Sequence, residues 1–235
     1  MLSTNSDIVR PTAGLNQNNM CSSPFDSLAR EYDSWFDEEG NLIFLIEARA
    51  LTELLSTLPK PWLEIGVGSG RFAQTLGIET GLDPSINLIK MAKLRGVNTI
   101  LGKGEQLIFI DKSFGTVFII CSLCFLDSPL EVLKEAHRIL IPGGSLVLGL
   151  VLKESPWGCF YQAMKAEGHR FYKYATFYEY DEVTALMKQA GFKTDRVVST
   201  LFQQPGNVRH IEKPCEGFSR NGGFTVIKAG KLCAE

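Results

Sequence analysis

The stretch Leu63-Glu64-Ile65-Gly66-Val67-Gly68-Ser69-Gly70 decides the fold. The apolar residues that lead into it predict a short buried strand, and residues 71–76 predict the helix that follows. Three glycines allow the connection to turn tightly and leave room for a ligand beside the backbone. The start of the next helix offers free N–H groups and the positive end of its dipole. The stretch therefore predicts a strand, a ligand-binding loop and a helix.

From residue 62 onward, the sequence alternates between predicted strands and helices. The sequence predicts strands over residues 62–65, 79–83, 97–101, 114–121, 145–151, 193–201 and 224–228. It predicts helices over 71–76, 85–94, 129–140 and 181–190, and Ser128 and Glu131 have the spacing of a capping box. This alternation predicts an α/β protein with a doubly wound, mostly parallel seven-stranded sheet.

The chain of 235 residues has the length of one domain. Residues 1–22 are polar and aperiodic, so we expect a flexible N-terminal tail followed by a single domain over residues 23–235. Two helices are predicted before the first strand, over about residues 25–36 and 42–58. Residues 153–178 interrupt the alternation and are expected to form a lid or substrate segment.

Composition excludes several classes of function. A net charge of −2 argues against a nucleic-acid partner bound through bulk positive charge. No run approaches the ~18–20 apolar residues of a membrane helix, and the first residues hold no secretory signal, so we expect a cytoplasmic protein without a membrane partner. Its six cysteines are expected to be reduced. The oligomeric state stays open.

Two acids flank the glycine loop. Glu64 stands at the end of the first strand, and Asp83 ends the next strand, 19 residues later (83 − 64). A carboxylate at the second position can accept hydrogen bonds from both hydroxyls of a ribose. Together the two acids favour a ligand with a cationic amine and a ribose over one with a pyrophosphate. S-adenosylmethionine has both features.

The glycine stretch resembles motif I of the class I S-adenosylmethionine (SAM)-dependent methyltransferases. The similarity continues through Gly81-Leu82-Asp83-Pro84-Ser85, residues 102–107 and 111–114, residues 133–144 and residues 187–192. It is similar to the small-molecule branch that includes ubiquinone/menaquinone-type methyltransferases. The resemblance implies a Rossmann-like methyltransferase fold whose last strand is antiparallel.

The resemblance also implies a cofactor site. Glu64 would hold the methionyl amine, Asp83 the ribose hydroxyls, and Pro84 would pack on the adenine. The complete set of implied cofactor residues is Tyr32, Glu64, Gly66, Gly68, Gly70, Asp83, Pro84, Gly104, Glu105, Cys121 and Ser122. Lys103 departs from the family pattern, in which many relatives carry an acid that reads the adenine amino group. Either Glu105 substitutes for that acid or the backbone alone reads the adenine edge.

Eight of the chain's 24 Phe, Trp and Tyr residues lie within residues 157–178. They either cover the sheet as plain packing or line an acceptor pocket, for which Trp157, Tyr161 and Tyr172 are the candidates. His169 is either a general base or an ordinary loop histidine. Cys121 and Cys124 have metal-ligand spacing, but no second pair completes four ligands, so no metal cofactor is expected. The alternatives are packing in the core, packing beside the cofactor, and binding of a metal or metalloid.

These observations predict SAM-dependent methyl transfer to a small-molecule acceptor by in-line displacement at the sulfonium methyl. Because the sulfonium is already activated, the protein mainly positions the acceptor and excludes water. Two alternatives stay open. One is a SAM-binding module without turnover, acting as a sensor or assembly partner, and the other is a nicotinamide-dependent oxidoreductase.

Overall fold

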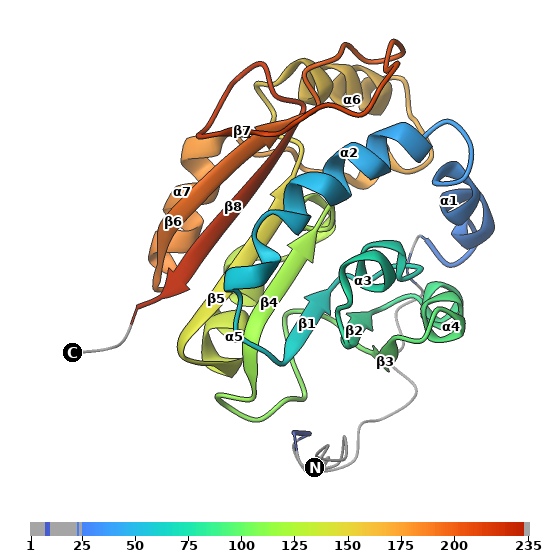
Figure 1. Cartoon of the computed structure of the whole chain (residues 1–235). Coiled ribbons are helices and arrows are strands. Elements are labelled where there is room, and N and C mark those ends of the chain that lie inside the picture. The colour runs from blue at the N-terminus through green and yellow to red at the C-terminus, as the bar shows by residue number, and fades with distance from the viewer. Residues whose placement is uncertain (1–7, 10–22, 24, 233–235) are drawn as a thin grey trace.

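The computed structural model describes residues 8–9, 23 and 25–232. At its centre lies an eight-stranded sheet in the order β3-β2-β1-β4-β5-β8-β6-β7 (Figure 1). The strands are β1 (Trp62–Ile65), β2 (Thr80–Asp83), β3 (Asn98–Leu101), β4 (Phe114–Ile120), β5 (Leu140–Leu150), β6 (Phe192–Thr200), β7 (Cys215–Glu216) and β8 (Phe224–Lys231).

The pairing of the strands confirms the predicted doubly wound topology. The pairs β1–β2, β1–β4, β2–β3 and β4–β5 are parallel, whereas β8 runs antiparallel to both β5 and β6. The sheet has eight strands instead of the predicted seven. The additional strand, β7, is a two-residue segment at the edge of the sheet, paired with β6 and too short to leave a periodic signal in the sequence.

Most helices lie where the sequence predicts them, but the helix that starts at Pro156 lies within residues 153–178, where no helix was predicted. The helices are α1 (Ala29–Trp35), α2 (Asn41–Thr52), α3 (Arg71–Leu76), α4 (Ile86–Leu94), α5 (Pro129–Ile139), α6 (Pro156–Ala166) and α7 (Tyr180–Gln189), with short 3-10 helices η3 (Leu55–Thr57), η4 (Leu123–Phe125) and η5 (Tyr172–Tyr174). The first helix begins later than predicted, because residues 25–28 form turns, and the second ends at Thr52 before η3.

The capping box predicted at Ser128 and Glu131 is wrong. Pro129 does start α5, but the Ser128 side chain accepts no hydrogen bond from the helix. The Ser128 N–H, which Glu131 would accept in a capping box, donates to Oε1 of Glu105 at 3.3 Å instead. Glu131 pairs with Lys134 at 2.8 Å. Both partners of the expected box are therefore engaged elsewhere.

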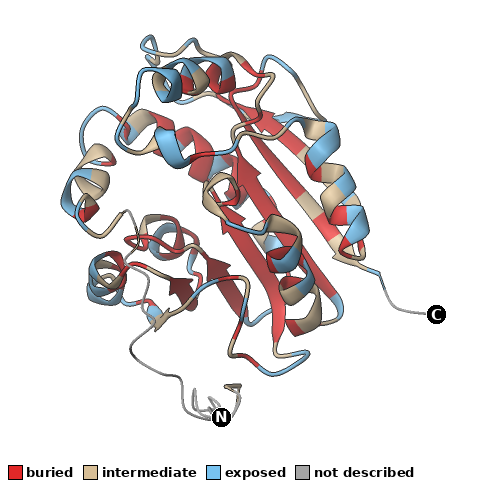
Figure 2. Cartoon of the chain, turned by 180° about the vertical axis from the view of Figure 1, so that it is seen from behind, coloured by how far each residue is buried: buried red, intermediate tan, exposed pale blue. Residues whose placement is uncertain are grey.

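Two apolar clusters pack on opposite faces of the sheet. Alternate residues of β4 point to opposite sides, so Phe118 and Ile120 join the cluster with α2 and α3, whereas Val117 and Ile119 join the cluster with α5 and α7. Figure 2 shows the buried strands continuing through the centre of the molecule. The sheet is thus covered on both faces, and a ligand can reach it only at the ends of its strands.

The strand order reverses between β2 and β4, which lie on either side of β1. In doubly wound sheets, ligands bind beyond the carboxyl ends of the strands at such a switch point. The loops that follow β1, β2, β4 and β5 meet there, and α1 and α6 lie beyond the same ends (Figure 1).

Most of the predicted N-terminal tail lies outside the described residues. Within it, Val9 forms an isolated antiparallel bridge with Phe109, and Ile110 N–H donates to the carbonyl of Ile8 at 3.0 Å. These two contacts place residues 8–9 beside the loop that precedes β4. Within the described segments, no helix has both the length and the hydropathy needed to cross a membrane.

Candidate active site

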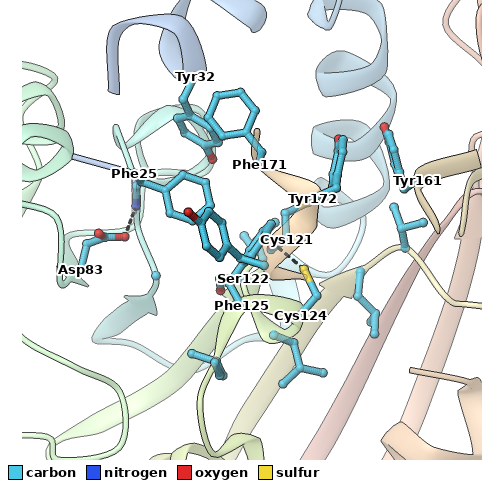
Figure 3. A pocket seen from close by; sticks show the side chains of 18 of the residues that line it. Phe25, Tyr32, Asp83, Cys121, Ser122, Cys124, Phe125, Tyr161, Phe171 and Tyr172 are labelled. Carbon is cyan, nitrogen blue, oxygen red and sulfur yellow. Dashed lines mark hydrogen bonds between the residues drawn. The ribbon is translucent and has the colours of Figure 1, made fainter. Parts of the chain in front are cut away.

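A cavity of about 760 Å³ lies beyond the carboxyl ends of four neighbouring parallel strands. Its walls include the last residue of each, Ile65, Asp83, Ile120 and Leu150. Small-molecule sites commonly measure about 300–1,000 Å³. In Figure 3, Asp83 lies on one side of this cavity and Tyr161 on the other. We call these two sides the Asp83 end and the tyrosine end.

The glycine loop forms the floor of the Asp83 end. Gly66 and Gly68 line the cavity and have φ of +77° and +53°, the left-handed region that favours glycine. A Cβ atom on Gly66 would lie 2.5 Å from the Cβ of Ser122, which no real contact tolerates. A Cβ atom on Gly68 would lie 3.4 Å from the ring of Tyr32. A side chain at position 68 would therefore occupy the space between the loop and α1.

Gly70 has a different environment from the other two glycines. It is the N-cap of α3 at φ +83°, and it is absent from the cavity wall formed by the described residues. A Cβ atom there would approach the Cα and Cβ of Ala92 in α4 to 2.9 Å. The structure thus gives Gly70 a role in packing α3 against α4, and its predicted contact with a cofactor stays a prediction.

The loop orients Asp83 toward the cavity. The N–H of Gly68 donates to Oδ2 of Asp83 at 2.9 Å, and the N–H of Ser85 donates to Oδ1 at 2.8 Å. Each oxygen keeps a second lone pair, so the carboxylate can still accept from a ligand diol. Burial raises the pKa of Asp83 to about 6, against the two backbone hydrogen bonds that lower it.

Glu64 lies buried beneath the same loop. Its side chain is 1% exposed, and its Oε2 atom has no hydrogen-bond partner within the described parts of the chain. Burial, together with the nearby Asp83, raises the pKa of Glu64 well above its ordinary value. The two acids predicted from the sequence are therefore brought together. A buried carboxylate oxygen without a donor is costly. Glu64 is absent from the cavity wall formed by the described residues, so its predicted contact with a cofactor stays a prediction.

Pro84, Gly104 and Glu105 also line the Asp83 end, as the resemblance implies. Gly104 fits closely, since a Cβ atom there would lie 2.8 Å from Cγ2 of Ile65. Lys103 turns toward Asp127, with Nζ 3.0 Å from Oδ2. Asp127 is therefore a second acid on this wall besides Glu105, and the sequence pattern does not single it out.

Tyr32, Cys121 and Ser122 line the middle of the cavity. The hydroxyl of Ser122 donates to the carbonyl of Ile65 at 3.0 Å and so joins the ends of β4 and β1. Cys121 has φ +53°, which is uncommon for a residue with a side chain and typical of strained functional sites. Among the described residues, no group of three or more His, Cys, Asp or Glu could hold a metal ion.

Aromatic side chains from α6 and η5 form the tyrosine end. The rings of Tyr161 and Tyr172 stack with centroids 4.3 Å apart, and the Trp157 ring lies 5.8 Å from Tyr161. Trp157 donates from Nε1 to the carbonyl of Gln203 at 2.8 Å, which fixes its orientation. All three line the cavity, and their predicted role in binding the substrate stays a prediction.

His169 lies at the edge of the cavity. Its ring stacks on Tyr172 with centroids 4.9 Å apart, and its Nδ1 accepts the N–H of Phe171 at 3.4 Å. Burial lowers the pKa of His169 below its ordinary value. One ring nitrogen is thus engaged in the loop, and the predicted role as a general base stays a prediction.

Glu47 is a site residue that the sequence analysis missed. It lies on α2, is 5% exposed and lines the cavity. A signal was available, because Ile43, Phe44, Ala50 and Leu51 stand three or four residues away on the same face of the predicted helix. An acid within an apolar helix face is a candidate site residue.

Comparison with known proteins agrees with this geometry. Residues 63–148 match the family described as a methyltransferase domain. A crystal structure from Thermotoga maritima, described as a SAM-dependent methyltransferase and possible histamine N-methyltransferase, is 39% identical. It superposes with a TM-score of 0.83, and the match covers 88% of this chain and 98% of that one.

Two sequence relatives complete the comparison. An uncharacterised protein of Methanocaldococcus jannaschii is 38% identical over 88% of this chain and 98% of its own length. The demethylmenaquinone methyltransferase of Thermotoga maritima is 24% identical over 72% of this chain and 86% of its own length. The fold, the glycine loop with its two acids and the near-complete match to the Thermotoga structure lead to one conclusion: the chain belongs to the class I SAM-dependent methyltransferases.

Proposed function

We propose that the protein transfers a methyl group from SAM to a small molecule bound at the tyrosine end of the cavity. One observation carries the proposal above all. The buried Oε2 of Glu64 lacks a donor among the described residues, and it lies beneath a glycine loop that also holds the carboxylate of Asp83. These two acids fit the ammonium and the ribose of SAM.

At the Asp83 end, different residues would bind different portions of SAM. Asp83 would accept the ribose hydroxyls with its remaining lone pairs, while Glu64 would offer its unpartnered oxygen to the methionyl ammonium. Gly66 and Gly68 would leave room for the methionine portion. Pro84, Gly104 and Glu105 would flank the adenine, and Tyr32 would close over the loop.

SAM supplies an activated methyl group on a cationic sulfur. Because the group is activated, the residues of the tyrosine end have to hold the acceptor in line with it and keep water out. Tyr161, Tyr172 and Trp157 provide apolar faces for this task. Phe25 and Phe171, which stack over the cavity, would exclude solvent.

Two chemical classes of methyl acceptor are the first to consider. The Thermotoga maritima relative is described as a possible histamine N-methyltransferase. At 39% identity over nearly its whole length, that description makes small amines the first compounds to screen. A ubiquinone- or menaquinone-like acceptor is the other class to include, since a demethylmenaquinone methyltransferase is among the relatives.

The main alternative is a protein that binds SAM without turnover. The two possibilities differ in one observable, the release of S-adenosylhomocysteine in the presence of an acceptor. A metabolite library with equal numbers of amines, phenols and quinols is therefore incubated with the protein and SAM. We expect release with one chemical class, whereas tight SAM binding without release from any compound would favour the sensor. A thermal shift with NAD but not SAM would overturn both in favour of the oxidoreductase.

A further inference from the structure

We infer that the tyrosine end binds a small cationic amine through Glu47, which also holds the proton that the amine gives up before methylation. The inference rests on the proposed function and deepens it by naming the class of acceptor and the residue that recognises it. It comes from the position of one buried acid, its lack of a partner and the rings around it.

Glu47 is buried on the apolar face of α2 and lines the cavity. Glu47 lies in the middle of α2, with buried Ile43 and Phe44 one turn before it and Ala50 and Leu51 one turn after it. Its side chain therefore points inward from the apolar face of the helix, into the cavity that it lines. Acids are rarely buried unless they are paired. An acid on this face therefore needs an explanation.

Glu47 is the buried acid of the cavity wall without a partner among the described residues. Of the five other acids on this wall, Glu39 is exposed and the remaining four are engaged: Asp83 by two backbone N–H groups, Glu105 by the N–H of Ser128, Asp127 by Lys103 and Glu31 by Arg170. For the carboxyl of Glu47, the described chain provides no hydrogen-bond donor and no ion pair. The donor would then come from the ligand.

Two tyrosines line the same cavity as Glu47. The rings of Tyr161 and Tyr172 are stacked on each other, and the charge of Glu47 contributes to raising the pKa of both. The face of an aromatic ring attracts a cation, and the attraction strengthens when water is excluded. A carboxylate beside stacked tyrosines therefore suits a cationic amine with an apolar body better than an alcohol or a carboxylate.

Burial favours the neutral forms of the other titratable groups near Glu47. The ionisation of Glu47 therefore sets the charge of the tyrosine end. Burial raises the pKa of Cys121, Tyr161 and Tyr172, which favours their neutral forms. Burial lowers the pKa of His169, whose ring stacks on Tyr172, and so favours its neutral form. Burial raises the pKa of Glu47 itself to about 8.

The proposed methylation of the amine conserves atoms, charge and electron pairs. An ammonium has no lone pair, so the bound amine first passes one proton to the carboxylate of Glu47. Its nitrogen lone pair then forms the new N–C bond, while the C–S bond breaks and its electron pair remains on sulfur. The methylated amine carries the positive charge away, and Glu47 returns its proton to solvent. A carboxyl with a pKa near the working pH is well matched to this exchange.

The test measures binding to the full chain saturated with S-adenosylhomocysteine. The probes are 2-phenylethylamine, histamine and the uncharged 2-phenylethanol, titrated calorimetrically into wild type and Glu47→Gln. We expect the wild type to bind at least one amine about tenfold or more tightly than the alcohol, and Glu47→Gln to lose that preference. The matched control is Glu53→Gln, at the C-cap of the same helix, which is absent from the cavity wall and should behave as wild type.

The pH dependence provides a second readout that plain packing would not change. Ammonium binding requires ionised Glu47, so 2-phenylethylamine should bind wild type roughly 20-fold more tightly at pH 8.5 than at pH 6.5, as expected for a group titrating near 8. In Glu47→Gln the affinity should not vary over this range.

Three outcomes would overturn the inference: equal affinity for amine and alcohol, unchanged amine affinity in Glu47→Gln, or failure of both amines to bind a protein that has bound S-adenosylhomocysteine. None of these three outcomes contradicts the proposed methyl transfer from SAM. Failure of the wild type to bind S-adenosylhomocysteine at all would instead overturn the proposed function, and this inference with it.

Discussion

The ring of Phe171 lies parallel to the ring of Phe25, with centroids 5.8 Å apart and planes 8° apart. Phe171 also meets the edge of Tyr32 on α1, and Arg170 forms an ion pair with Glu31 on the same helix. Residues 153–178, which the sequence predicts to form a lid, thus contact the N-terminal helix beside the cavity (Figure 3). The two elements are expected to open and close together.

Cofactor binding should therefore protect both elements from hydrogen exchange. Lids belong to the less stable parts of a fold and tighten when a ligand binds. With S-adenosylhomocysteine, amides of α1 and α6 should exchange about tenfold or more slowly, whereas α7 on the other face should not change. Phe171→Ala should remove most of the added protection on both elements. Equal exchange rates with and without ligand would mean that the aromatic residues only pack against the sheet.

Asp83→Asn should weaken binding of S-adenosylhomocysteine by roughly 30–150-fold, which corresponds to about 2–3 kcal/mol. The amide keeps one oxygen for a backbone N–H but can no longer accept from two ribose hydroxyls. Calorimetry with the purified variant measures the loss, and Asp181→Asn, at the exposed start of α7, is the control. Unchanged affinity in a folded Asp83→Asn protein would contradict the assignment.

The same carboxylate predicts a pH dependence of cofactor binding. Because burial raises the pKa of Asp83 to about 6, the group binds a proton as the pH falls through 6 and then loses acceptor capacity. Affinity for S-adenosylhomocysteine should hold from pH 8 to about pH 6.5 and fall below pH 6 in the wild type. Titrations at several pH values test this. If Asp83→Asn still loses affinity below pH 6, a group other than Asp83 causes the effect.

The two glycines Gly68 and Gly70 should respond differently to substitution. Gly68→Val places its side chain between the loop and Tyr32, so cofactor binding should be lost, while left-handed backbone strain costs only about 1–2 kcal/mol of stability. Gly70→Ala brings a methyl group within 2.9 Å of Ala92 and should mainly lower the melting temperature. Thermal melts with and without S-adenosylhomocysteine separate the two. A normal ligand shift in Gly68→Val would mean that the loop is not the site.

Glu47→Gln should stabilise the ligand-free protein in a pH-dependent way. The pKa of Glu47 is about 8 when folded, against an ordinary value of 4.5, so the folded state holds a proton that the unfolded state has lost. Wild type therefore loses stability as the pH rises from 4.5 to 8, by on the order of 3–5 kcal/mol in total. The melting temperatures of variant and wild type should coincide near pH 4.5 and diverge toward pH 8. A constant difference across that range would contradict the raised pKa.

The sequence was sufficient for the parts of the fold that depend on local signals. β1 and α3 have the predicted boundaries because a buried strand, a glycine turn and a short helix follow one another within 15 residues. The capping box at Ser128 failed for a non-local reason, since Glu105 takes the N–H that Glu131 would have accepted. Hydrogen bonds between distant segments leave no periodic signal.

The same difference between local signals and contacts between distant segments applies to the site. Glu64 and Asp83 could be placed together because parallel strands bring their carboxyl ends to one edge of the sheet. The orientation of Lys103 toward Asp127 depends on the loop before α5, and the contact of Phe171 with Phe25 joins residues 146 positions apart (171 − 25). Glu47 was missed because a lone acid in a helix usually faces solvent.

A crystal structure with S-adenosylhomocysteine bound tests the central claim most directly. The ribose hydroxyls should lie within hydrogen-bond distance of the Asp83 carboxylate and the ammonium should satisfy Oε2 of Glu64, directly or through one water. The sulfur should point toward Tyr161, Tyr172 and Glu47. A ligand with its adenine among the tyrosines, or one bound outside this cavity, would contradict the account.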